Sequence, residues 1–272
     1  MTAFNEKQQV HDFWNQAACG ETLYLKSTDI EGYDYEAQAR KRYQLEPIIL
    51  DFAAFESTKG MKVLEIGVGL GADHQEFAKA GAELYGIDLT ERAIEHTLKR
   101  LDRFGLHSSL AVGDAENLSF DAETFDVVYS WGVLHHSPNT PAAISECWRV
   151  LKRGGVAKIM IYHKWSMVGI MLWMRYGLFR LRPFTSMKTI YGNYLESPGT
   201  KAYSVSEAQQ MFAQFSHVDI HTQLSHGDLL TSDAGQRHRG IILSLAKKIW
   251  PRWFIQKFLP SAGIFMLIQA RK

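Results

Sequence analysis

The chain has 272 residues, of which 46% are hydrophobic, and its 30 Lys and Arg nearly balance 29 Asp and Glu. This length and apolar content suit one α/β domain with insertions. The first ten residues are polar and no apolar run reaches the roughly 18 residues of a membrane span, which predicts a cytoplasmic protein without a leader. Cys19 and Cys147 have no metal-ligand spacing, so we expect neither a disulfide framework nor a metal site.

Taken in chain order, the hydrophobic pattern predicts helices alternating with strands. Two helices, at 4–18 and 35–55, come first. Five strands alternating with helices follow, at 62–67, 83–88, 109–112, 125–130 and 156–161. Such alternation indicates a parallel sheet with helices on both faces. The pattern breaks after residue 162, and later elements are a helix opening with the capping box Ser204-x-x-Glu207 and strands at 217–224 and 263–270.

Residues 62–71 read KVLEIGVGLG, an apolar strand followed by three glycines on alternate positions. Because glycine has no Cβ, such a loop can turn sharply and let the backbone approach a ligand closely. The helical spacing from Asp73 to Ala80 puts a helix N-terminus, with its unpaired N–H groups and positive end, directly after the loop. A strand, a glycine loop and a helix in this order predict a nucleotide-type cofactor site.

Acidic residues follow three of the predicted strands or stand within them. Asp88 closes the second strand, where a carboxylate can accept hydrogen bonds from the ribose hydroxyls of NAD or of S-adenosylmethionine. Glu65 stands two residues before the first glycine, where it can face a cationic amino group, and Asp114 follows the third strand. The glycine loop alone also fits the dinucleotide pattern that allows Ala at its third position, so it leaves both cofactors open.

In this order and spacing, residues 46–161 resemble the class I S-adenosylmethionine-dependent methyltransferases of the broad UbiE/type-11-like group, with a looser match to the C-terminus. The resemblance implies a Rossmann-like, seven-stranded, mostly parallel sheet whose antiparallel C-terminal strand lies between strands five and six. It implies S-adenosylmethionine as cofactor but leaves the acceptor open, because the group methylates quinones, sterols, sugars, amines, peptides and small acids. The residues that it places around the cofactor are Glu65 and Gly67 at the amino acid end, Gly69 and Gly71 in the loop, Asp88 at the ribose, Leu89, Asp114 and Ala115 at the adenine, and Ser130 and Trp131 near the methyl group.

Methyl transfer from a sulfonium is an in-line displacement, which depends mainly on alignment and on dry walls. An acceptor hydroxyl, amine or acidic carbon also needs a base, whereas a carboxylate or thioether does not. Histidine titrates in the useful range. By family position the candidates are His135 and His136 after the fourth strand and Tyr162 and His163 at the end of the fifth. The alternative is that the paired histidines only fix the loop before Pro138.

Segments 163–203 and 225–262 interrupt the strand pattern and are rich in Met, Trp, Phe and Ile. We expect two helical hairpins that bury each other's apolar faces as a cap; an apolar substrate pocket and a membrane-surface face are the alternatives. Residues 1–150 carry a net charge of −11 and residues 151–272 one of +12. That asymmetry indicates either an anionic partner or pairing between the halves. Basic residues of the insertions are Arg175, Arg180, Arg182, Lys188, Arg237, Arg239, Lys247, Lys248, Arg252 and Lys257.

The predicted domain organisation is an N-terminal helical lid (1–55), a cofactor-binding core (56–162), two cap insertions (163–203 and 225–262) and the remainder of the core (204–224 and 263–272). The predicted function is methyl transfer from S-adenosylmethionine to a small-molecule acceptor, anionic or apolar, without nucleic-acid binding; a homodimer is compatible with it. The first alternative is a membrane-surface lipid or quinone methyltransferase. A second, an NAD(P)-dependent oxidoreductase, is disfavoured by Glu65 and by the apparent seventh strand. A third is a non-catalytic cofactor-binding module.

Overall fold

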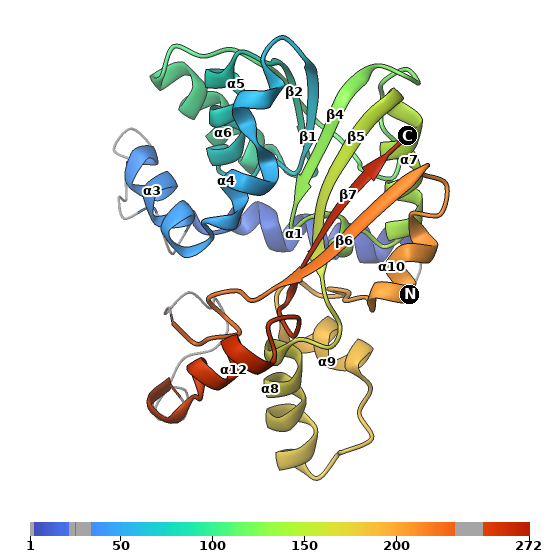
Figure 1. The fold of residues 1–272 in the computed structure, drawn as a ribbon. Helices are drawn as coiled ribbons and strands as arrows, with labels where there is room; N and C mark the ends of the chain where they lie inside the picture. Colours follow the sequence, from blue (N-terminus) through green and yellow to red (C-terminus); the bar gives the residue numbers. More distant parts are fainter. Residues whose placement is uncertain (1–2, 22–24, 26–33, 232–246) are drawn as a thin grey trace.

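The computed structural model describes residues 3–21, 25, 34–231 and 247–272. One seven-stranded sheet with the order β3-β2-β1-β4-β5-β7-β6 forms its centre (Figure 1). Strands β1 to β5 pair in parallel, whereas β7 is antiparallel to both neighbours, β5 and β6. The predicted Rossmann-like sheet with an antiparallel C-terminal strand is therefore confirmed. Its strands are β1 Lys62–Ile66, β2 Glu83–Asp88, β3 Ser109–Val112, β4 Phe125–Trp131, β5 Leu151–Tyr162, β6 His217–Gln223 and β7 Phe265–Arg271.

Helices cover both faces of the sheet and enclose two apolar cores. One core joins the sheet to α7 and α10, through Ile144 and Phe212 among others. The second core joins the opposite face to α4 and α5, through Phe52 and Phe77. The α-helices of the described part of the chain are α1 Ala3–Gln16, α3 Tyr35–Leu45, α4 Ile48–Ala53, α5 Ala72–Ala80, α6 Glu91–Arg103, α7 Thr140–Val150, α8 Met167–Tyr176, α9 Met187–Tyr194, α10 Val205–Met211 and α12 Arg252–Phe258.

Two predicted element boundaries are wrong for local backbone reasons. The single helix expected at 35–55 is divided into α3 and α4, because Pro47 lacks an N–H and holds the preceding Glu46 outside the helical region, at φ −129° and ψ 60°. Strand β5 begins at Leu151 and not at Val156. Leu151 already pairs with Phe125, and the residues after it bulge out before Val156 resumes the pairing with Val127.

The first insertion packs on itself at the end of the sheet where the parallel strands finish (Figure 1). Helix α8 lies against α9 so closely that a Cβ on Gly169 would come within 2.2 Å of the Tyr191 hydroxyl oxygen. Tyr191 is buried, and its hydroxyl contacts Ser166 Oγ (2.8 Å) and donates to the carbonyl of His163 (3.0 Å). The second insertion accepts two backbone hydrogen bonds from the start of this hairpin, because Met167 N–H donates to the carbonyl of Ala262 (2.8 Å) and Val168 N–H donates to Asp228 Oδ1 (3.1 Å).

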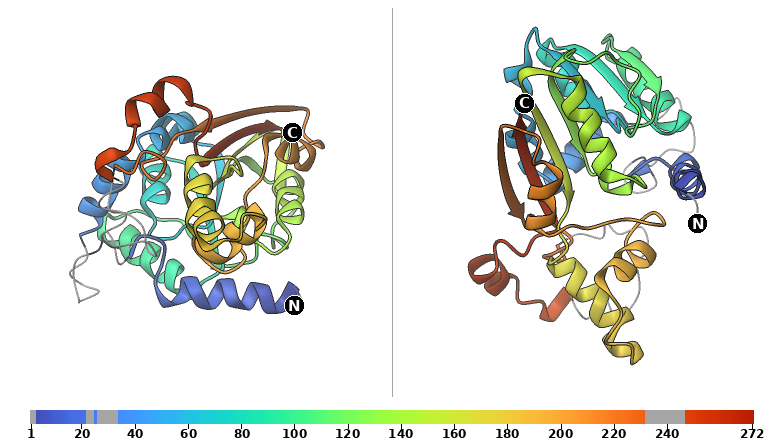
Figure 2. Two further views of the ribbon diagram at one scale, coloured as in Figure 1. Left: turned by 90° about the horizontal axis from the view of Figure 1, so that it is seen from below. Right: turned by 90° about the vertical axis from the view of Figure 1, so that its right-hand side faces the viewer.

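The second insertion does not bury the aromatic face of the first in the described part of the chain. Of the apolar side chains on α12, only Ile255 is buried, while Trp253, Phe254 and Phe258 are exposed. Arg237 and Arg239, like the apolar residues expected at 241–245, lie outside the described residues. Among the described helices, the two insertions therefore do not bury each other's apolar faces. Both views in Figure 2 place α12 on the opposite side of the molecule from α1.

Among the described residues, none of the helices combines the length and the apolar character that crossing a bilayer requires.

Candidate active site

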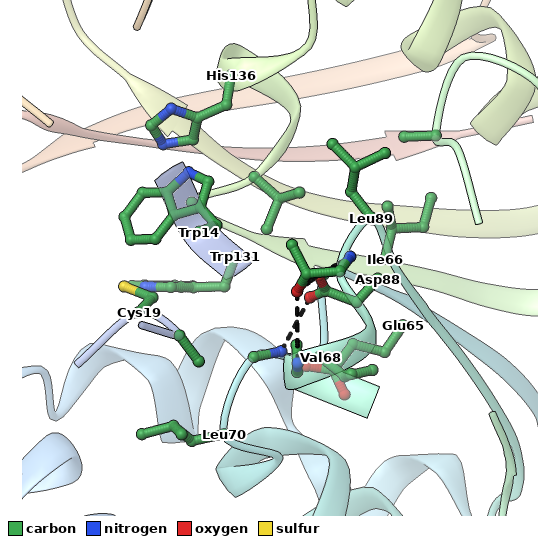
Figure 3. A pocket seen from close by; sticks show the side chains of 18 of the residues that line it. Trp14, Cys19, Glu65, Ile66, Val68, Leu70, Asp88, Leu89, Trp131 and His136 are labelled. Atoms are coloured by element: carbon green, nitrogen blue, oxygen red, sulfur yellow. Dashed lines mark hydrogen bonds between the residues drawn. The ribbon is translucent and has the colours of Figure 1, made fainter. Parts of the chain in front are cut away.

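A cavity of about 280 Å³ opens at the carboxyl ends of β1, β2 and β4. The glycine loop, the loops after β2, β3 and β4, and the N-terminal helices α1 and α3 supply its walls. Glu65 and Asp88 lie toward one end, and Trp14 and His136 lie toward the other (Figure 3). Eight of the ten residues expected at the cofactor line this cavity: Glu65, Gly67, Gly69, Asp88, Leu89, Asp114, Ala115 and Trp131.

The other two expected cofactor residues are not among the lining residues. Ser130 is fully buried and donates its hydroxyl to the carbonyl of Ile66 (3.0 Å), so it ties β4 to β1. Gly71 caps α5, and a Cβ there would come within 2.9 Å of Thr97 Oγ1. Both residues support the wall of the cavity from behind.

Two glycines of the loop serve different purposes. Gly69 has φ +53°, and a Cβ built on it meets no atom within 4 Å, so the backbone here faces open space. Gly67 has φ +85°, but its Cβ would lie 2.1 Å from Val133 Cγ2. Gly67 therefore permits packing against the loop after β4, whereas Gly69 leaves room for a ligand close to the main chain.

Asp88 is held rigidly at the cavity wall. One carboxylate oxygen accepts hydrogen bonds from the backbone N–H (3.0 Å) and hydroxyl (2.9 Å) of Thr90, and the other accepts from the Gly69 N–H (3.2 Å; Figure 3). Burial raises the pKa of Asp88, although these hydrogen bonds oppose the shift. The carboxylate is therefore fixed at the cavity wall, where a ribose hydroxyl can donate to it.

Glu65 lies beside a buried imidazole. Its Oε2 is 2.8 Å from His74 Nδ1, while His74 Nε2 is 2.8 Å from Ser108 Oγ. The Ser108 hydroxyl itself donates to the carbonyl of Leu84 (2.8 Å), so Nε2 must be the donor and Nδ1 the acceptor of a neutral ring. Burial lowers the pKa of His74 to about 3, and burial, reinforced by nearby Asp73, raises the pKa of Glu65 well above its usual value. These two pKa shifts favour a neutral pair, in which the Glu65 carboxyl donates to His74 Nδ1.

Asp73, at the first turn of α5, joins the N-terminal segment to the cofactor loop. Arg42 binds it with two prongs (Nε to Oδ1 3.1 Å, Nη2 to Oδ2 2.8 Å), and the hydroxyls of Tyr43 (3.1 Å) and Tyr129 (2.8 Å) donate to the same carboxylate. Burial alone would raise the pKa of Asp73, but the Arg42 charge and these hydrogen bonds hold it below its usual value. Sequence reasoning read Asp73 only as the start of a helix.

Arg100 makes a second connection between the same parts. Its side chain is completely buried and donates to the carbonyls of Leu70 and Tyr35 (both 2.7 Å), to Gln38 Oε1 (2.7 Å) and to Gln75 Oε1 (2.6 Å). Burial lowers the pKa of Arg100 to about 10. The guanidinium therefore fixes α3, the glycine loop and α5 relative to one another.

Helix α1 lies over the part of the cavity assigned to the adenine. Lys7 Nζ is 2.5 Å from Asp114 Oδ2 and 2.9 Å from Glu116 Oε2. Asp114 Oδ1 accepts from the Glu116 N–H (2.9 Å), so both of its oxygens have partners. Further along, the Trp14 ring lies edge-on to His136, with 5.5 Å between the ring centroids. A cofactor amine that reaches Asp114 must share this carboxylate with Lys7 or displace it.

Three of the four predicted catalytic residues, His135, His136 and Tyr162, lie together, whereas His163 does not join them. His136 and Tyr162 line the cavity; His135 is fully buried behind them; and His163 turns away, with Nδ1 3.1 Å from the carbonyl oxygen of Gly263. The group that joins the first two is Glu196, whose Oε2 accepts from the Tyr162 hydroxyl (3.0 Å) and lies 3.4 Å from His136 Nε2.

Glu196 was missed because it comes from the first insertion, 34 residues after Tyr162 in the chain. Only five acidic residues occur in residues 151–272, against 17 basic ones. A lone carboxylate in so basic a segment is the sequence signal that could have singled it out.

Comparisons with known proteins agree with this geometry. Residues 64–159 match the family model of a methyltransferase domain. The chain is 36% identical over 111 residues to a sterol 24-C-methyltransferase of Gibberella zeae, covering 40% of this chain and 28% of that protein. It is 28% identical over 145 residues to a ubiquinone biosynthesis O-methyltransferase of Coxiella burnetii, covering 53% of this chain and 54% of that protein. The chain thus spans about a quarter to a half of the length of these relatives.

A solved structure extends the likeness to the whole fold. Magnesium protoporphyrin IX methyltransferase from Synechocystis PCC 6803, solved with bound S-adenosylmethionine, has a TM-score of 0.55 over 98% of this chain and 97% of its own, at 12% identity. At that identity the likeness concerns the fold alone. Residues 64–159 are thus a methyltransferase domain, and the strand order and the meeting of the glycine loop with Asp88 at one cavity agree with the resemblance to the class I S-adenosylmethionine-dependent methyltransferases.

Proposed function

We propose that this protein transfers a methyl group from S-adenosylmethionine to a small-molecule acceptor. The observation that carries the proposal is one cavity in which Gly69 leaves its backbone open and Asp88 is held at the wall by hydrogen bonds from Gly69 and Thr90. Both features fit an adenosine cofactor held close to the main chain.

When bound, the cofactor supplies a methyl group that its sulfonium charge has already activated. The carboxylate of Asp88 accepts a hydrogen bond from the ribose, and Glu65 faces the amino group. Trp14 and Trp131 line the opposite end of the cavity, where they exclude water from the reacting atoms. The protein's own contribution is thus alignment and exclusion of solvent.

The acceptor end of the cavity combines apolar walls with one polar group. Met160 and Phe265 line it beside Trp131, and Phe265 contacts that ring at 5.4 Å between centroids. Tyr162, His136 and Glu196 supply the polar group. This lining fits an apolar or aromatic acceptor that carries one hydroxyl or other ionisable group. His136 remains our candidate for proton transfer, acting together with Glu196, whereas His135 and His163 do not line the cavity.

Titration calorimetry on Asp88→Ala tests the cofactor assignment. Loss of one hydrogen bond to a charged group costs roughly 1.5–3 kcal/mol, so the affinity for S-adenosylmethionine should fall at least about tenfold. Glu91→Gln, three residues away but outside the cavity, should bind like the wild type. An unchanged affinity in folded Asp88→Ala protein, or tight binding of NAD by the wild type, would refute the proposal.

A second candidate, an acceptor reached at a membrane surface, is favoured by the exposed side chains of the insertions. Phe184 is 100% exposed, Leu181 92% and Ile249 82%. Lys257 Nζ lies 4.9 Å from the centroid of the exposed Trp253 ring. Aromatic and basic side chains together suit the interface of an anionic lipid bilayer. Flotation with anionic vesicles at low and high salt tests this candidate. The cytoplasmic location and the homodimer stay predictions.

A further inference from the structure

Two histidines and a carboxylate meet at the acceptor end of the cavity. His135 and His136 belong to the short helix Leu134–His136 after β4, and Glu196 belongs to the segment after α9. One side-chain nitrogen or oxygen from each of the three lies within 4.8 Å of the others. They are the one such group of metal-ligand side chains among the residues that the structure describes.

The polar atoms of His135 are unsatisfied. The side chain has no exposed surface, and neither Nδ1 nor Nε2 has a hydrogen-bond partner. Its ring is tilted by 37° against that of Tyr162 (3.9 Å between centroids) and lies 4.3 Å from the ring of His136. Buried polar groups in proteins almost always have partners, because an unpaired one loses its hydration without compensation. An imidazole left in this state beside a second imidazole and a carboxylate indicates a missing ligand.

The spacing of His136 and Glu196 fits two ligands of one cation. Their Nε2 and Oε2 atoms are 3.4 Å apart. With bonds of about 2.0–2.1 Å, neighbouring ligand atoms of a metal lie roughly 3.0–3.4 Å apart. A shift of about 1 Å by the His135 ring would bring the third ligand into the same range.

Partners that orient these ligands are also present. His136 Nδ1 lies 2.8 Å from Ser197 Oγ, which can accept its proton and leave the Nε2 lone pair toward Glu196. The Tyr162 hydroxyl donates to Glu196 Oε2 (3.0 Å). Metal-binding histidines and carboxylates usually have such second partners, which fix the tautomer and the orientation of the ligand.

We propose that His135, His136 and Glu196 bind a divalent transition-metal cation, of the Zn²⁺ or Fe²⁺ class, at the acceptor end of the cavity. Two imidazoles and one carboxylate suit these ions and leave coordination positions open. Because His136 and Glu196 line the cavity, the open positions face the space for the acceptor.

The use of such a cation, unlike its binding, rests on the proposed methyltransferase function. A cation lowers the pKa of a hydroxyl oxygen that it binds, so the proton leaves to water. An oxygen lone pair then forms the bond to the methyl carbon while the carbon–sulfur bonding pair returns to the sulfonium sulfur. A hydroxyl acceptor would then need no histidine base, and His136 would hold the cation instead of taking the proton.

Metal binding can be measured without turnover. After dialysis against a chelator, the full-length protein should bind one equivalent of Zn²⁺ by calorimetry and give a Co²⁺ absorption spectrum. Glu196→Gln should weaken Zn²⁺ binding at least tenfold. Glu91→Gln is the matched control, because Glu91 Oε2 also lies beside a histidine (His11 Nε2, 3.1 Å) but has no buried third ligand. Absence of saturable Zn²⁺ binding, or equal binding by wild type and Glu196→Gln, would overturn the proposal.

Two further measurements keep the outcome interpretable. S-adenosylmethionine affinity, measured on the same metal-free samples, shows whether Glu196→Gln is folded and separates failure of the metal site from failure of the cofactor assignment. If that variant does not fold, X-ray absorption of the Zn²⁺-loaded wild type decides. Two imidazoles with oxygen donors support the site, whereas a sulfur ligand, which in this cavity would be Cys19, excludes it.

Discussion

Glu65 makes cofactor binding a proton-linked event. Burial raises the pKa of Glu65 and lowers that of His74, which favours a neutral carboxyl that donates to the imidazole. An ammonium group placed beside it favours the ionised form. Binding should therefore release up to one proton per cofactor, and the affinity should rise with pH below the pKa of Glu65 and level off above it.

Calorimetry in two buffers of different ionisation enthalpy measures this release directly. Glu65→Gln cannot ionise, so it should bind S-adenosylmethionine more weakly and without proton release. Asp88→Ala is the control, since it should lose affinity yet keep the release. If the wild type releases no proton on binding the cofactor at any pH below the pKa of Glu65, then Glu65 is already ionised or does not meet the amino group.

Residues with several roles in the site differ in how far sequence could predict them. Glu65 and Asp88 follow from their positions next to predicted strand ends, which fix the cavity they face. The roles of Asp73 and Arg100 could not be predicted, because their hydrogen-bond partners lie at least 25 residues away in the chain. Glu196 belongs to the same class: it meets Tyr162 only through the path of the first insertion.

At the scale of single elements, we expect α1 to act as a lid, and Lys7 supplies one of its contacts with the core. This lysine pairs with Asp114 and Glu116 and is partly buried, so the contact is worth about 1 kcal/mol. Lys7→Met should loosen α1, raise the hydrogen exchange of its amides, and speed cofactor association and dissociation about two- to fivefold.

Stopped-flow fluorescence and hydrogen exchange check the lid prediction. Trp14, on the lid, and Trp131, on the wall, are placed to report closure. Lys41→Met, an exposed lysine on α3, is the matched control. Equal exchange and equal rates for wild type and Lys7→Met would indicate that α1 is a fixed part of the wall.

Helices and strands could be predicted where the local sequence shows a periodic apolar pattern or a residue that begins or ends an element. The strands around the cofactor site have short apolar runs, and the capping box at Ser204 and Glu207 marks the start of α10 as expected. The division of α3 from α4 could have been predicted only by reading Pro47 as a helix break, although the apolar spacing on both sides of it is helical. The early start of β5 depends on pairing with Phe125, which no local pattern contains.

At the scale of the whole molecule, three described cap cations lie over rings and form no ion pair with the acidic half. Arg175 and Arg180 lie over Tyr176, and Lys257 lies over Trp253 and Phe258. Arg252 donates to backbone carbonyls instead. The structure therefore favours an external anionic partner over internal pairing for these cations. The packing of the two insertions could not be deduced from their apolar content.

If the cap meets a bilayer, Lys248 and Lys257 should each contribute about 1 kcal/mol to vesicle binding. Replacing either by Gln should lower partitioning to anionic vesicles about fivefold, the double variant should lose both contributions, and high salt should remove the difference. Lys59→Gln, an exposed lysine just before β1, should behave as the wild type. Partitioning that is indifferent to all these changes would rule the membrane out as the partner of the cap.

The four hydrogen bonds of Arg100 have a consequence for how the N-terminal region can open. Helix α3 supplies two of the acceptors, so it cannot leave the core without stranding a buried cation. Helix α1 supplies none of these acceptors and contacts the core through buried Val10, the Lys7 ion pairs and the partly exposed side chains of His11 and Asn15. We therefore expect α1 to move when a ligand enters while α3 stays in place. The chain should fold without residues 1–16, although water would then reach the site, whereas removal of α3 should prevent folding.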